Sequence, residues 1–187
     1  MRRKNNLIAL LVLIGLVAYG TYDYLHKSSS DIGPVTEAGE AGPETGIRKG
    51  RLAPDFALED LQGNTVRLSD FRGKKVLVNF WASWCPPCKA EMPHLQKFYG
   101  EYQSKDVVIL GVNLTAIEKH PDNAQKFAQA QQLTFPIVLD REGAVMQTYQ
   151  VYAYPTTYVL DSDGVIREIF QGAMTYDMMK ETVSKIK

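Results

Sequence analysis

"WASWCPPCKAEMP", residues 81–93, contains both cysteines of the 187-residue chain, separated only by two prolines. The run before it, KKVLVNFWA at residues 74–82, is mostly apolar and is bounded by charge, which predicts a central buried strand. Proline is tolerated in the first turn of a helix, so Pro86 and Pro87 predict a helix that begins at the cysteines and ends near Tyr102, kinked at Pro93. The sequence therefore places its cysteine pair where a buried strand meets a helix.

The cysteine pair allows three chemical interpretations, of which a structural staple is the weakest. A disulfide across so few residues closes a small loop and removes little chain entropy. A structural zinc site needs four Cys or His ligands, and His26, His94 and His120 do not complete one with the pair. We therefore expect no metal site, although two thiolates alone can hold a soft metal ion such as copper for delivery.

A redox centre fits the local physics best. The free N–H groups and the dipole of a helix N-terminus favour the thiolate form of Cys85. We expect Cys85 to be exposed and nucleophilic and Cys88, one turn further along, to be sheltered. Cys85 then attacks a substrate disulfide, and Cys88 resolves the mixed disulfide.

The remainder of residues 51–187 alternates predicted strands with predicted helices. A hairpin is expected around residues 62–64 and another around residues 161–164, because turn residues separate alternating or apolar runs there. Buried strands are predicted at 106–114 and 135–140, and helices at 121–132, 143–149 and 175–185. The pattern predicts an α/β domain with a mixed central sheet and helices on both faces.

The N-terminal fifty residues differ from the rest in composition. Arg2, Arg3 and Lys4 precede an apolar run at residues 7–19, which is typical of a membrane anchor or a cleaved signal peptide. We predict an anchor over residues 1–27, a flexible Gly- and Glu-rich tether over 28–50, and a folded domain over 51–187. The basic head predicts a single-pass protein with a cytoplasmic N-terminus and an extracytoplasmic domain. The 21 basic residues balance 21 acidic ones, which argues against nucleic acid as a partner.

The stretch NFWASWCPPCKAEMP, together with YPTT at residues 154–157, resembles the thioredoxin superfamily. The longer stretch APDFALEDLQGNTVRLSDFRGKKVLVNFWASWC, residues 53–85, is similar to the TlpA/ResA type of membrane-anchored thiol–disulfide oxidoreductases, which includes members that act in cytochrome c maturation and spore formation. The resemblance implies a thioredoxin-like three-layer sandwich with an N-terminal hairpin extension and a central insertion at residues 114–135.

The resemblance also implies roles for individual residues. Cys85 and Cys88 become the redox disulfide, Pro155 matches a cis-proline beside it, and Glu91 matches an acid that handles thiol protons. Thioredoxins proper have a buried aspartate where this chain has Asn79, so Glu91 is the available proton acceptor for Cys88. We expect Glu91 to be solvated, so that its replacement by glutamine changes stability little. The predicted substrate contacts lie between the two cysteines or beside them: Trp84, Pro86, Pro87, Tyr154, Pro155 and Thr156.

The function implied is reduction of protein disulfides without a cofactor. The expected partners are a disulfide-containing protein, of which an apocytochrome c is the first suggestion, and a thiol-reductant carrier in the membrane. A disulfide oxidase or isomerase and a metal-delivery protein remain alternatives. A thiol peroxidase is a further alternative, but Ala82 stands where such an enzyme would carry the threonine of a T-x-x-C site.

Overall fold

The computed structural model describes residues 14–23 and 43–186. Residues 14–23 are helical and belong to a unit separate from the domain that follows. Within these described residues, no helix combines the length and the apolar character needed to cross a bilayer. Most of the predicted anchor and tether, residues 1–13 and 24–42, lies outside the described part.

The domain is built on one mixed sheet of seven strands in the order β2-β1-β5-β4-β3-β6-β7. The central strands pair in parallel, β3 with β4 and β4 with β5, whereas β6 and β7 on one side and β1 and β2 on the other are antiparallel. The strands are β1 (Ala57–Asp60), β2 (Thr65–Arg67), β3 (Lys75–Trp81), β4 (Val107–Asn113), β5 (Ile137–Leu139), β6 (Thr156–Leu160) and β7 (Ile166–Gln171).

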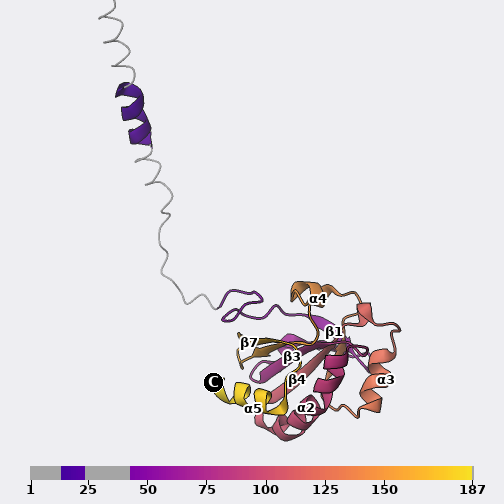
Figure 1. The fold of residues 1–187 in the computed structure, drawn as a ribbon. Helices are drawn as coiled ribbons and strands as arrows, with labels where there is room; N and C mark the ends of the chain where they lie inside the picture. The colour runs from indigo at the N-terminus through magenta and orange to yellow at the C-terminus, as the bar shows by residue number, and fades with distance from the viewer. Residues whose placement is uncertain (1–13, 24–42, 187) are drawn as a thin grey trace, which may run out of the picture. The chain divides into compact units, whose positions relative to one another are not determined.

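Helices cover both faces of the sheet, as the sequence predicts (Figure 1). One face packs against α2 (Pro86–Tyr102), α3 (Asn123–Ala130) and α5 (Tyr176–Lys185), and the other against α4 (Ala144–Thr148). Short 3-10 helices are η1 (Leu68–Phe71), η2 (Gln103–Lys105) and η3 (Thr115–Ile117). The predicted α2 is confirmed and continues through Pro93, while α3 is shorter than the expected 121–132.

The alternation of side chains along β3 decides what reaches α2. Successive strand residues point to opposite faces. Leu77 and Trp81 join the core beneath α2, whereas Val78 and Phe80 join the core beneath α4. Asn79 therefore projects toward the α2 face, which prepares its contact with the helix that carries the cysteines.

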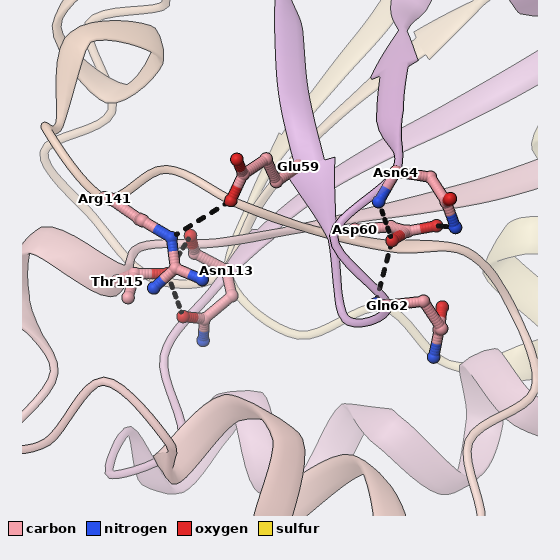
Figure 2. A network of polar contacts seen from close by, with 7 residues as sticks. All are labelled: Glu59, Asp60, Gln62, Asn64, Asn113, Thr115 and Arg141. Atoms are coloured by element: carbon pink, nitrogen blue, oxygen red, sulfur yellow. Dashed lines mark hydrogen bonds and ion pairs between the residues drawn. The ribbon is translucent and has the colours of Figure 1, made fainter.

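The predicted N-terminal hairpin is formed by β1 and β2. Its turn is held by the Asp60 carboxylate, which accepts hydrogen bonds from the backbone N–H groups of Gln62 and Asn64, both at 2.8 Å, and from the Asn64 side chain (Figure 2). Gly63 supplies the positive φ, +85°, that the turn requires.

The folded domain begins earlier than the predicted boundary at residue 51. Gly46 N–H donates to the Leu52 carbonyl, Leu52 N–H donates to the Glu44 carbonyl, and Gly50 N–H donates to Ile166 in β7. Residues 44–50 thus follow an ordered path against the sheet edge. The prediction that these residues belong to a flexible tether is wrong. The amino-acid composition of residues 44–50 does not predict this order, because the contacts are hydrogen bonds between backbone groups.

Candidate active site

The cysteine pair forms a disulfide at the start of α2. Cys85 is the N-cap residue of the helix, and its sulfur accepts a hydrogen bond from the Cys88 N–H at 3.3 Å. The buried strand β3 ends at Trp81, and the connecting residues turn the chain directly into the helix. The strand and helix predicted from the sequence therefore bring the two sulfurs together.

The expectation that Cys85 is exposed is wrong for this disulfide form. Cys85 is 3% exposed and Cys88 is fully buried. The Cys85 sulfur is turned inward toward Cys88 and lies 3.6 Å from the Tyr154 carbonyl oxygen, so little of the residue faces solvent. Access by a substrate therefore depends on the residues around the pair.

Pro86 and Pro87 occupy the first two positions of α2 and are exposed. Neither proline has a backbone N–H, so each removes a donor that a helix N-terminus usually offers to a thiolate. The Cys88 N–H is the donor that contacts Cys85 in this structure.

Glu91 is fully buried, which corrects the expectation of a solvated side chain. One carboxylate oxygen accepts a hydrogen bond from the Met174 N–H at 2.8 Å, and the other accepts one from the Asn79 amide at 3.0 Å. Burial raises the pKa of Glu91 to about 7, although these two hydrogen bonds lower it. A carboxyl group one turn after Cys88 with this pKa can exchange a proton near neutral pH.

Asn79 links β3, α2 and β6 below the pair. Its amide N–H₂ group donates to Glu91 and, at 2.9 Å, to the Thr157 hydroxyl. Its oxygen is buried without a hydrogen-bond partner among the described residues. The asparagine thus orients the glutamate without supplying a second titratable group.

The segment before β6 borders the disulfide on the other side. The Tyr154–Pro155 peptide bond is cis, in line with the resemblance, and Pro155 is buried. The Thr156 hydroxyl donates to the Ala153 carbonyl at 2.8 Å, so that side chain is occupied internally. The Tyr154 ring is half-buried and remains within reach of the surface.

Trp84 is 39% exposed and packs edge-to-face against Tyr154, with ring centroids 6.1 Å apart. Its indole N–H donates to the Ile117 carbonyl at 3.0 Å. A further contact that the sequence did not predict joins Ser83 to Glu118. The two residues lie 35 positions apart, and no spacing rule connects a loop glutamate with this turn.

Among the described residues, no group of three or more His, Cys, Asp or Glu side chains is arranged to hold a metal ion. His94 and His120 are exposed, and His26 lies outside the described part. The domain therefore surrounds the disulfide with a buried glutamate, Glu91, and with the aromatic rings of Trp84 and Tyr154.

Comparison with known proteins points to the same chemistry. Residues 49–169 match the model of the AhpC/TSA family. The chain is 37% identical to "Thiol-disulfide oxidoreductase ResA" of Geobacillus kaustophilus, in an alignment that covers 100% of this chain and 99% of the relative.

Two solved structures share the fold. StoA from Bacillus subtilis is 36% identical with a TM-score of 0.63, over 70% of this chain and 96% of StoA. The exposed lipoprotein thioredoxin Etrx1 from Streptococcus pneumoniae is 32% identical with a TM-score of 0.61, over 71% of this chain and 100% of the other.

Proposed function

The chain belongs to the AhpC/TSA family and is a thiol–disulfide oxidoreductase of thioredoxin-like fold, and from this premise we propose that it reduces protein disulfides outside the cytoplasm. The observation that carries the proposal is the Cys85–Cys88 disulfide at the start of α2, in which the N-cap residue Cys85 is followed by two prolines without N–H groups. This arrangement supplies a nucleophile and a resolving thiol while limiting stabilisation of the thiolate.

The reaction begins from the dithiol form. The Cys85 thiolate attacks one sulfur of the substrate disulfide, and the other substrate sulfur leaves as a thiolate that takes a proton. Glu91 accepts the proton of Cys88, whose thiolate then attacks the Cys85 sulfur. The second substrate thiol is released, and the enzyme is left as the disulfide seen in this structure. Two electrons have passed from the enzyme to the substrate.

The rim around the pair supports binding of a polypeptide. Trp84 and Tyr154 offer aromatic surface beside the sulfur of Cys85, and Pro86 and Pro87 are exposed next to it. The backbone of Tyr154, restricted by the following proline, suits pairing with an extended substrate strand. The first substrate class that we propose is an apocytochrome c, whose C-x-x-C-H segment can form a compact disulfide.

The proposed location rests on the sequence and on one relative. Arg2, Arg3 and Lys4 before the apolar run at residues 7–19 favour a cytoplasmic N-terminus, a membrane anchor and an external domain. Etrx1 is described as an exposed lipoprotein. In that location a membrane thiol carrier has to return the enzyme to its dithiol form.

Trapping tests the proposal. In Cys88→Ala the mixed disulfide cannot be resolved, so Cys85 should remain bonded to its substrate, and reductant should release that protein. A variant lacking both cysteines is the control. The reduction potential of the wild-type protein should lie nearer the thioredoxin value of about −270 mV than the strong-oxidant value of about −120 mV.

Two results would contradict the assignment as a disulfide reductase. A potential near the strong-oxidant value would make the protein a disulfide donor. Rapid consumption of hydrogen peroxide by the dithiol form, without exchange with disulfides, would make it a peroxidase. Labelling of Cys85 by a reagent confined to the cytoplasm would refute the location alone.

A further inference from the structure

Glu118 lies directly after η3, in the insertion that separates β4 from β5, and its carboxylate collects three hydrogen bonds. One oxygen accepts from the Ser83 backbone N–H at 2.6 Å and from the Asn113 amide at 2.9 Å. The other oxygen accepts from the Ser83 hydroxyl at 2.6 Å. Two of these three donors belong to the turn that leads into the active-site cysteine.

These contacts join a charged acceptor to neutral donors. Hydrogen bonds to an ionised carboxylate are roughly twice as strong as bonds between neutral groups. In the described part of the chain, Glu118 forms no ion pair with lysine or arginine, so the three donors are what hold it. A bond to the Ser83 backbone N–H fixes the path of the main chain as well as a side chain.

The segment that precedes Glu118, residues 114–117, is hydrogen-bonded to the sheet. Leu114 N–H donates to the Trp81 carbonyl at 2.9 Å, and Ala116 N–H donates to the Asp140 carbonyl at 3.0 Å. These bonds attach the residues just before Glu118 to the ends of β3 and β5. Because this segment is fixed to the sheet, the Glu118 carboxylate can hold the Ser83 turn in one position.

The orientation of Asn113 is fixed from behind. The Thr115 hydroxyl donates to the Asn113 side-chain oxygen at 2.8 Å (Figure 2), which leaves the amide N–H₂ group directed at Glu118. Asn113 is fully buried at the end of β4. The Glu118 carboxylate is therefore fixed by Asn113 at the end of β4, and it in turn fixes Ser83 in the active-site turn.

The same insertion also fixes the aromatic ring of the site. Ile117, the residue before Glu118, accepts the indole N–H of Trp84. Ser83 and Trp84 are consecutive, so the insertion holds the backbone of the first and the ring of the second. Cys85 follows at once as the N-cap of α2.

We propose that Glu118 is a positioning residue, which holds the Ser83–Trp84 segment so that the Trp84 ring and the Cys85 sulfur present one fixed surface to a substrate polypeptide. The proposal rests on thiol–disulfide exchange at Cys85, but not on the direction of that exchange or on the location of the protein. It assigns the insertion a function in substrate recognition.

Two substitutions separate position from charge. Glu118→Ala removes all three hydrogen bonds. Glu118→Gln removes the charge but keeps an oxygen for the Ser83 N–H and the Asn113 amide, and its NH₂ group can donate to the Ser83 hydroxyl, which turns to accept. A positioning role therefore predicts that glutamine rescues most of what alanine loses. Glu142→Ala, at an exposed position, is the matched control.

The first measurement reads the position of Trp84 directly. Trp81 and Trp84 are the tryptophans of the chain, and Trp81 is fully buried, so acrylamide quenching of the oxidised protein reports mainly on Trp84. Glu118→Ala should raise the quenching constant, while Glu118→Gln and Glu142→Ala should leave it near the wild-type value. Thermal unfolding of each variant checks that the domain is folded.

The second measurement compares two substrates of the dithiol form. One is a synthetic peptide with an intramolecular C-x-x-C-H disulfide, and the other is a small aromatic disulfide reagent. Glu118→Ala should lower kcat/KM for the peptide by about tenfold, because a misplacement of 1 Å can cost about a hundredfold and a smaller displacement costs less. The small reagent, which needs little of the aromatic surface, should react at nearly the wild-type rate.

The outcomes are distinct. Equal losses in Glu118→Ala and Glu118→Gln would assign the effect to charge and overturn the proposal, as would unchanged quenching and kinetics in a folded Glu118→Ala. Should Glu118→Ala unfold, Ser83→Ala removes only the hydroxyl bond and must show a smaller change of the same kind. If the wild type does not reduce the peptide but reacts with the small reagent, the proposed substrate class is wrong. The quenching of Trp84 then still tests the positioning role of Glu118.

Discussion

At Glu91, burial and hydrogen bonding act on the carboxyl group in opposite directions. Removal from water disfavours the charged form, whereas the Met174 N–H and the Asn79 amide favour it. Burial is the larger effect, and the pKa of about 7 gives a group that is partly protonated at neutral pH. A solvated glutamate would be ionised throughout the physiological range and would be a weaker base for a thiol.

Glu91→Gln should change how stability depends on pH. The pKa of Glu91 is about 7 in the folded protein, against its ordinary value of 4.5, so the folded state binds the proton more tightly. The stability from this group is fully present below pH 4.5 and is lost as pH rises through 7, by about 3 kcal/mol in total. The glutamine variant lacks this dependence, and its urea unfolding at pH 5 and pH 8 should differ less than that of the wild type.

The control for this prediction is Glu142→Gln, which removes an exposed carboxyl group and should preserve the wild-type pH dependence. Parallel stability curves for wild type and Glu91→Gln would show that Glu91 is not perturbed. The same variant should slow resolution of the mixed disulfide, since Cys88 then loses the group proposed to take its proton.

At the scale of elements, the N-terminus of α2 sets the balance between thiol and disulfide. The helix presents Pro86 and Pro87 where two N–H groups would face Cys85, and the Cys88 N–H contacts the sulfur. A thiolate stabilised by fewer donors is a poorer leaving group, and its disulfide is harder to reduce. The element therefore favours a reducing couple.

Replacing Pro86 and Pro87 by residues with N–H groups, one of them histidine, should lower the Cys85 pKa and raise the reduction potential. The conversion is about 30 mV for each 1.4 kcal/mol of added stabilisation of the dithiol state. Equilibration with glutathione measures the potential, and the pH dependence of alkylation measures the pKa. The two exposed prolines at the site can be changed without disturbing the core. An unchanged potential would mean that the prolines only stiffen the turn.

The sequence predicted the elements because each leaves a local signal. The apolar run of β3, the prolines that open α2 and the turn residues between β6 and β7 are all read within a few positions. The burial of Glu91 and the contact of Glu118 with Ser83 have no such signal. Glu91 lies in the core, where it accepts a hydrogen bond from Met174, more than eighty positions later in the chain. Glu118 reaches the active site because the insertion returns to the end of β3.

At the scale of the whole molecule, composition misplaced the start of the domain. Glycines and charges at residues 43–50 predict a flexible tether, but the chain there bonds through its backbone, which composition does not report. The Lys49–Glu168 ion pair adds little, because both side chains are largely exposed. The order in this segment comes from its pairing with residue 52 and with β7.

A shorter and a longer fragment of the domain should therefore differ in stability. A fragment of residues 51–187 lacks the bonds of Gly46, Glu44 and Gly50 to the rest of the domain, whereas residues 43–187 keep them. Each such hydrogen bond contributes about 1 kcal/mol net, so the shorter fragment should be less stable by about 2–3 kcal/mol in urea unfolding. The longer fragment should match the full chain, and protease should cut the full chain before residue 43 but spare residues 43–50. Equal unfolding midpoints for the two fragments would return the domain boundary to residue 51.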